Sequence, residues 1–226
     1  TLSFWLSEAG IARATIGHLS WVGLAYGFKF LWSPLVDRLP LPFLTARLGK
    51  RRAWLLLSQV CIAAALLGMA NTDPAQNLTH MVYLALAVAF ASATQDIALD
   101  AYRIEAVETE KQGAMAATYQ AGYRIAMITA GAGVLWIAAS VDPSEATYDF
   151  RPWQVAYTVM AALMAVGMLT TLIIREPKKK ISSVTTEREA HTRERFAAAG
   201  LHGWLLTATA WFHSAVLSPF IDFIQR

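Results

Sequence analysis

Long apolar stretches, separated by short polar segments, dominate the sequence. A helix that crosses the roughly 30 Å hydrocarbon core of a bilayer needs about 20 mostly apolar residues. The stretches that approach this length are Thr15–Ser33, Ala53–Ala70, Met81–Ala101, Tyr119–Ser140 and Trp153–Ile174. Residues 1–6 have the composition of the end of an earlier helix, and Pro34 is expected to stop the helix at 15–33. The pattern predicts an all-α polytopic membrane bundle, with the end of helix 1 at 1–6 and helices 2 to 6 at 15–33, 53–70, 81–101, 119–140 and 153–174.

Lys and Arg are distributed unevenly between the two sets of connecting segments. Only Arg13 and Arg151 lie on one side of the predicted spans. Fourteen basic residues lie on the other side: Arg38, Arg47, Lys50, Arg51, Arg52, Arg103, Lys111, Arg175, Lys178, Lys179, Lys180, Arg188, Arg193 and Arg195. Cytoplasmic loops carry the excess of Lys and Arg, so this second side is predicted to be cytoplasmic.

The last fifth of the chain differs from the rest. Residues 175–200 are charged and polar, which predicts a cytoplasmic linker. Residues 201–226 are hydrophobic but are interrupted by His213, Pro219 and Asp222. They are expected to form either a helix at the membrane interface or the approach to a seventh helix.

Composition supports a lipid environment and argues against several functions. Hydrophobic residues make up 56% of the chain and charged residues 15%, whereas soluble domains carry about 25% charge. The net charge of +3 is concentrated in loops on one side, so no nucleic-acid partner is predicted. The histidines lack metal-ligand spacing, and there is neither a phosphate-binding loop nor a nucleophile elbow. We therefore expect no metal, no cofactor and no catalytic residue.

Four ionisable residues lie inside the predicted spans: Lys29, Asp96, Asp100 and Arg124. Such residues are costly in lipid and are functional candidates. Asp96 and Asp100 are four residues apart and share one helix face, where mutual repulsion favours binding of a proton. Alternatively, both carboxylates only neutralise Arg124, Lys29 or a helix terminus. Lys29 could also extend to the headgroups, while Arg124 suits a ligand that carries a carboxylate or phosphate.

Two sequence phrases resemble a known transporter family. Lys29–Arg38, followed by Arg51 and Arg52, resembles the loop between the second and third helices of major facilitator transporters. Gln95–Glu105 and the tripeptide Gly122–Arg124 resemble the AmpG family of bacterial inner-membrane permeases, to which acetyl-CoA transporters are related. The resemblance implies that the chain is the N-terminal six-helix half of a transporter with a C-terminal half of similar fold. Because it begins with Thr1, we read the chain as part of a longer protein.

The resemblance also implies a function and a set of site residues. AmpG permeases import GlcNAc-anhydroMurNAc, with or without peptide, for peptidoglycan recycling, and proton symport is thought to drive them. The expected partners are a muropeptide-like small molecule, protons, the lipid bilayer and the C-terminal half. The expected substrate and proton-coupling residues are Gln95, Asp96, Asp100, Arg124, Lys29 and Tyr123. The expected cytoplasmic gate residues are Asp37, Arg38, Arg51, Arg52, Arg103 and Glu105, although the extra residues 39–49 leave the gate pairing open.

The working hypothesis is alternating access in a multi-pass protein of the bacterial inner membrane. Asp96 is the expected proton-sensitive group, with Arg124 as its partner or as a ligand for substrate carboxylates. Transport of acetyl-CoA or another solute is the alternative within the same superfamily. A membrane-embedded enzyme that uses Asp96 and Asp100 is the rival from another class, as is a receptor or scaffold that transports nothing. The sequence supplies no nucleophile or metal ligands for the enzyme, and the receptor leaves the charges inside the spans unexplained.

Overall fold

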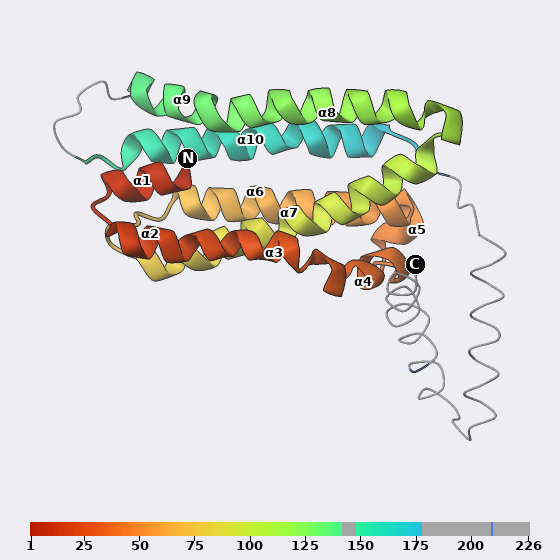
Figure 1. Ribbon diagram of the computed structural model, residues 1–226, viewed down its shortest axis with the longest axis horizontal. Coiled ribbons are helices and arrows are strands. Elements are labelled where there is room, and N and C mark those ends of the chain that lie inside the picture. The colour runs from red at the N-terminus through yellow and green to blue at the C-terminus, as the bar shows by residue number, and fades with distance from the viewer. Residues whose placement is uncertain (142–147, 178–208, 210–226) are drawn as a thin grey trace. The chain divides into compact units, whose positions relative to one another are not determined.

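The computed structural model describes residues 1–141, 148–177 and 209, and the regular elements in these ranges are helical (Figure 1). In chain order they are α1 (Leu2–Glu8), α2 (Arg13–Leu19), η1 (Ser20–Gly23), α3 (Leu24–Gly27), η2 (Lys29–Leu31), α4 (Ser33–Arg38), α5 (Leu44–Leu48), α6 (Lys50–Ala70), α7 (Leu78–Ala106), η3 (Thr109–Lys111), α8 (Gln112–Ile128), η4 (Thr129–Gly133), α9 (Val134–Val141) and α10 (Arg151–Ile173). The predicted linker at 175–200 lies outside the described residues from 178 onward, and the segment at 201–226 lies outside them apart from Thr209.

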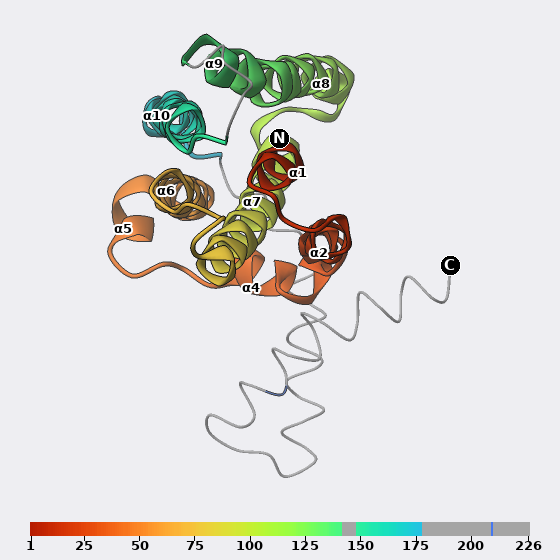
Figure 2. The same ribbon diagram turned by 90° about the vertical axis from the view of Figure 1, so that its left-hand side faces the viewer.

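Four helical stretches of the described ranges are long and apolar enough to cross a membrane: Lys50–Ala70, Leu78–Ala106, Thr109–Val141 and Arg151–Ile173. Within Thr1–Pro177, α6 packs against α7 and α10, and α10 also packs against α9. Viewed end-on, α6 lies between α10 and α7 (Figure 2). The all-α polytopic fold predicted from the apolar pattern is confirmed.

The helix expected at 15–33 is divided into shorter pieces. The backbone passes from α2 through the 3-10 turn η1 to α3, leaves helical geometry at Phe28, and resumes in η2. Gly17, Gly23 and Gly27 lie along this stretch, and each weakens a helix by about 1 kcal/mol relative to alanine. Pro34 does not end the helical path but stands in the first turn of α4, where its missing N–H costs no helical hydrogen bond.

The other long helices extend beyond the predicted ranges. α7 begins at Leu78, where the side chain of Asn77 accepts a hydrogen bond from the N–H of His80 and so caps the helix. The helix expected at 119–140 already begins at Gln112 and contains a π-helical turn over Thr129–Gly133. This turn coincides with the small-residue sequence Thr-Ala-Gly-Ala-Gly, whose flexible backbone tolerates the wider winding.

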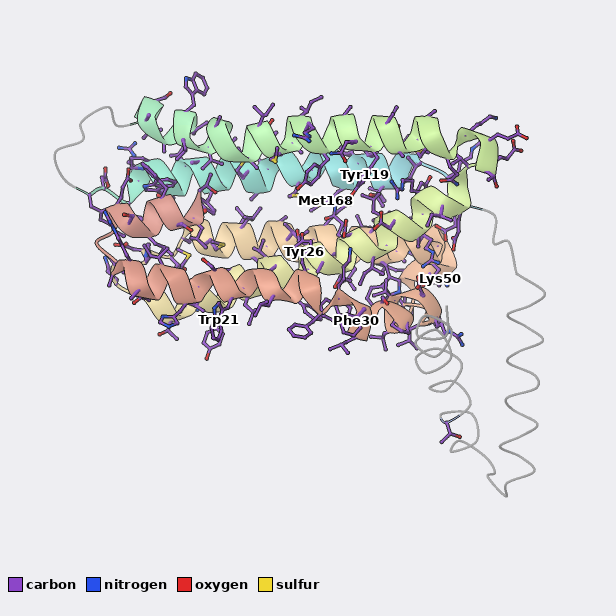
Figure 3. All side chains as sticks on the ribbon, viewed as in Figure 1. Trp21, Tyr26, Phe30, Lys50, Tyr119 and Met168 are labelled. Carbon is purple, nitrogen blue, oxygen red and sulfur yellow. The ribbon has the colours of Figure 1, made fainter. Side chains whose placement is uncertain are left out.

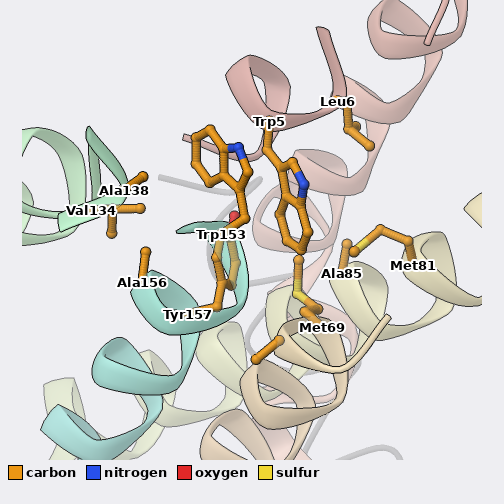
Figure 4. Packing of buried hydrophobic residues seen from close by; sticks show 11 residues of the cluster. Trp5, Leu6, Met69, Met81, Ala85, Val134, Ala138, Trp153, Ala156 and Tyr157 are labelled. Atoms are coloured by element: carbon orange, nitrogen blue, oxygen red, sulfur yellow. The ribbon is translucent and has the colours of Figure 1, made fainter. Parts of the chain in front are cut away.

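The main hydrophobic core lies where α1 meets the ends of α6, α7 and α10 (Figure 4). Trp5 and Trp153 are almost fully buried and stack with ring centroids 5.6 Å apart. Tyr157 packs on Trp5 at 4.8 Å, and Met69 and Met81 complete the cluster. Large aromatic surfaces of this kind provide most of the packing energy of a small core.

Polar groups at the rim of this core are matched to one another. The indole N–H of Trp153 donates to Glu8 at 2.7 Å, and that of Trp5 donates to the hydroxyl of Tyr148 at 3.2 Å. Tyr148 in turn donates to Asp73 at 2.8 Å. Burial raises the pKa of Tyr148, so its hydroxyl stays protonated and available as a donor.

Candidate functional site

The first group of candidate residues lies along one face of α7. At about 100° per residue, Asp96, Asp100 and Arg103 fall within about 60° of one another around the helix axis. Glu105 is displaced from Asp96 by about 180° and lies on the opposite face. The two faces of α7 therefore bind different cations. Asp96 pairs with Lys29, and Glu105 pairs with Arg51.

Lys29 is the partner of Asp96. Its ammonium group forms an ion pair and hydrogen bond with Oδ2 of Asp96. The side chains are 35% and 26% exposed, so the pair is half-buried within the described residues. The sequence left Arg124 and Lys29 open as partners of Asp96, and among the described residues the ion pair is with Lys29.

The break in the helical path explains how Lys29 reaches α7. After Phe28 the chain turns through η2 and lies against α7, where the indole N–H of Trp32 donates to Thr94 Oγ1 at 3.2 Å. The Trp32 ring also stacks on Phe90 with centroids 4.5 Å apart. Both contacts lie close in sequence to Lys29 and Asp96, so they keep these two side chains next to each other.

A second charge pair follows one turn later on the same face. Arg103 approaches Asp100 at 3.5 Å and places its guanidinium carbon 5.0 Å from the ring centroid of Tyr119, on α8. The hydroxyl of Tyr119 donates to Oδ1 of Asp96 at 3.4 Å. Figure 3 shows where Tyr119 lies among the side chains of the bundle. Among the described residues, Nε of Arg103 is buried without a hydrogen-bond partner.

Arg124 and Tyr123 are not joined to these pairs. Both side chains are exposed on α8, and the described residues supply Arg124 with no ion pair or hydrogen bond. Gln95 lies beside Asp96 and is half-buried, without a hydrogen bond to another described residue. No described carboxylate therefore neutralises the guanidinium of Arg124.

The second group of candidates meets at the end of the bundle where α4, α6 and α7 converge. Arg51 donates from Nη1 to Asp37 at 2.6 Å and from Nη2 to Glu105 at 2.6 Å, while its Nε is shared between the two carboxylate oxygens of Glu105 at 3.1 and 3.2 Å. Its side chain is only 8% exposed. Lys50 adds a hydrogen bond from its ammonium to the backbone carbonyl of Asp37. We call Arg51, Asp37 and Glu105 the gate cluster.

The gate cluster does not include the remaining residues expected in the gate. Arg52 donates to the backbone carbonyls of Thr171 at 2.8 Å and Leu172 at 2.7 Å, at the end of α10. A cation is favourable there because the last carbonyls of a helix carry partial negative charge. Arg103 turns toward Asp100 and Tyr119, and Arg38 ends α4 next to Asp37.

Glu176 belongs to this region and was missed by sequence reasoning. Its carboxylate accepts the backbone N–H groups of Arg51 at 2.8 Å and Arg52 at 3.1 Å, in the first turn of α6. Gly49 precedes this turn with φ of 89°, and a Cβ there would collide with the Glu176 side chain. The available signal was a single acidic residue within the basic run 175–180.

Glu176 and Arg52 form a reciprocal contact between two helices. The carboxylate occupies the positive end of α6, and the guanidinium occupies the negative end of α10. Tyr102 extends the contact to α7, since its hydroxyl donates to the carbonyl of Arg175 at 2.9 Å. The gate cluster is thus built on a backbone that α6, α7 and α10 hold together.

The carboxylates in the described part of the chain are also of the kind that can bind metal ions. No group of three or more His, Cys, Asp and Glu side chains there could hold a metal ion. The carboxylates of both charge groups face cations instead.

The chain is similar to known membrane transporters. A profile described as Major Facilitator Superfamily matches residues 1–225. The chain is 39% identical over 190 residues to the anhydromuropeptide permease of Escherichia coli (strain K12). These residues make up 84% of the chain and 36% of that relative. It is 34% identical over 226 residues to a Rickettsia felis protein named as transporter AmpG 4. This match covers 100% of the chain and 48% of that relative. A Rickettsia prowazekii protein named as transporter AmpG 3 is 33% identical over 187 residues. This match covers 82% of the chain and 42% of that relative.

These relatives confirm the resemblance that the motifs indicated. The chain spans less than half the length of the three relatives named above. No solved structure matches it.

Proposed function

The chain belongs to the Major Facilitator Superfamily, and we propose that it forms the N-terminal half of a bacterial inner-membrane transporter that imports anhydromuropeptides. Membership of this family and four membrane-capable helices make it part of an integral, multi-pass membrane protein. The names of the relatives support muropeptides as the substrate class. A transporter function, and not an enzymatic one, also fits a site made of charge pairs.

The observation that carries the proposal is the Lys29–Asp96 ion pair. It joins a broken helical segment to α7 within the stretch that is apolar enough to span a membrane. Ionised groups persist at such depth when they are paired, and solute or proton pathways are where they gather. Protonation of Asp96 removes the negative charge that holds Lys29, which would change the relative free energies of the two access states.

Arg124 is the proposed ligand for the substrate. A planar guanidinium binds carboxylates through two parallel hydrogen bonds, and the muramic acid or peptide part of a muropeptide presents carboxylates. Arg124 is exposed on α8, which leaves it free of competing carboxylates in the described residues. The C-terminal half would supply the other side of the cavity.

Uptake by the full-length protein in proteoliposomes tests the substrate. Radiolabelled GlcNAc-anhydroMurNAc-peptide should accumulate under an inward proton gradient, and excess acetyl-CoA should not compete with it. Arg124→Gln should raise KM about tenfold, because one charge-assisted contact is lost. Arg13→Gln, an exposed arginine at the start of α2, is the matched control. Accumulation of acetyl-CoA instead of the muropeptide would overturn the assignment.

A further inference from the structure

α8 makes few contacts with the rest of the described helices. None of the residues in Gln112–Ile128 is buried, and the helix packs mainly against η3 and η4, its neighbours in the chain. Ile125 and Ile128 are 67% and 64% exposed. The position of this helix relative to α7 therefore depends on a small number of side chains.

Tyr119 is the side chain through which the middle of α8 touches the charged face of α7. Its hydroxyl lies 3.4 Å from Oδ1 of Asp96, while its ring lies under the guanidinium of Arg103 at 5.0 Å. Hydrogen bonds between oxygens are usually 2.5–3.0 Å long. A small displacement of α8 would shorten or break a contact of 3.4 Å. The hydrogen bond to Asp96 therefore depends on the position of α8.

Both charge pairs meet at this one residue. Asp96 is paired with Lys29, and Asp100 is paired with Arg103. Tyr119 donates to a member of the first pair and offers its ring to a member of the second. A cation over an aromatic face is attracted by the negative charge density of the ring. Withdrawal of Tyr119 would therefore change the surroundings of both carboxylates at once.

We propose that Tyr119 is a positioning residue that makes the Lys29–Asp96 pair sensitive to the position of α8. The inference rests on the proposed transport function and adds a route by which helix movement changes the proton-binding group. The charged and titratable groups around the Lys29–Asp96 pair come from several neighbouring elements: Tyr26 of α3, which acts on Lys29, Asp100 and Arg103 of α7, and Tyr119 of α8. Of these, only Tyr119 belongs to the loosely packed helix.

Two substitutions at one position separate the two contacts. Tyr119→Phe removes the hydroxyl and keeps the ring under Arg103, whereas Tyr119→Leu removes both. In proteoliposomes of the full-length protein, Tyr119→Phe should move the midpoint of the pH profile of uptake to higher pH, because the carboxylate has lost one donor. Tyr119→Leu should lower kcat about fivefold or more, with KM changed less than about twofold. Tyr83→Phe, which removes an exposed hydroxyl from the same α7 helix, should change neither quantity.

The distance between α7 and α8 tests the role of Tyr119 in the absence of substrate. Spin labels at Leu86 on α7 and Ile125 on α8 replace exposed side chains. Tyr119→Leu should broaden the distance distribution, and Tyr83→Phe should leave it unchanged. Failure of the unmodified protein to take up muropeptide would contradict the proposed function only. A pH profile, a kcat and a distance distribution that all match the unmodified protein would overturn the role of Tyr119.

Discussion

The gate cluster and the Lys29–Asp96 pair are both made of cations and carboxylates, yet they are built differently. Arg51 is 8% exposed and makes four hydrogen bonds to two carboxylates, on a backbone that Glu176 also binds. Lys29 is 35% exposed and bonds one carboxylate, to which, among the described residues, Tyr119 donates a second, longer hydrogen bond. Fully bonded charges fix a structure, whereas sparsely bonded charges can change partners. From this comparison we propose a structural role for the first group and a switching role for the second.

Loss of Arg51 should have the largest effect on stability. Arg51→Met in the full-length protein removes the buried guanidinium that joins Asp37 to Glu105, and should lower the free energy of unfolding by about 3 kcal/mol. Chemical denaturation in mixed micelles measures this quantity. Arg47→Met removes an exposed arginine from α5 and should change it by less than about 0.5 kcal/mol. Equal effects of the two substitutions would remove the distinction between the clusters.

Glu176→Gln should have an intermediate effect. The amide still accepts a hydrogen bond, but the negative charge at the first turn of α6 is lost, which costs about 1 kcal/mol. The same denaturation experiment detects it, with Glu110→Gln on η3 as the exposed control. An unchanged free energy of unfolding would mean that Glu176 does not secure the gate cluster.

Lys29→Met should have the smallest effect on stability and a clear effect on transport. The pair is only half-buried, and Asp96 can bind a proton once Lys29 is gone, so the free energy of unfolding should change by about 1 kcal/mol or less. Uptake should fall about tenfold, because Asp96 loses the cation whose release couples protonation to the access state. A loss of stability as large as that of Arg51→Met, or full retention of uptake, would contradict the switching role.

The sequence predicted the long helices well because apolar length alone specifies a membrane span. α6 and α10 lie close to the predicted ranges 53–70 and 153–174. The helix at 15–33 was less predictable, since its three glycines allow breaks whose positions depend on packing against α7. That break is what brings Lys29 to Asp96.

The sequence did not show which residues of the site contact each other, because this depends on how the helices pack. Tyr119 and Arg124 are five residues apart, so they lie about 140° from each other around α8. Since Tyr119 faces Asp96, Arg124 cannot face it as well. Glu176 was missed for a related reason: it is remote in sequence from Arg51 and Arg52, and only the fold brings it to their backbone N–H groups.

Proton movement on addition of substrate tests the switching role most directly. Sealed vesicles that contain the full-length transporter, without an imposed gradient, receive the muropeptide while the external pH is recorded in weak buffer. The unmodified protein should make the external solution more alkaline. Asp96→Asn should abolish this change while it retains exchange of labelled for unlabelled substrate. An equal pH rise in Asp96→Asn would contradict the assignment of Asp96 as the proton-binding group.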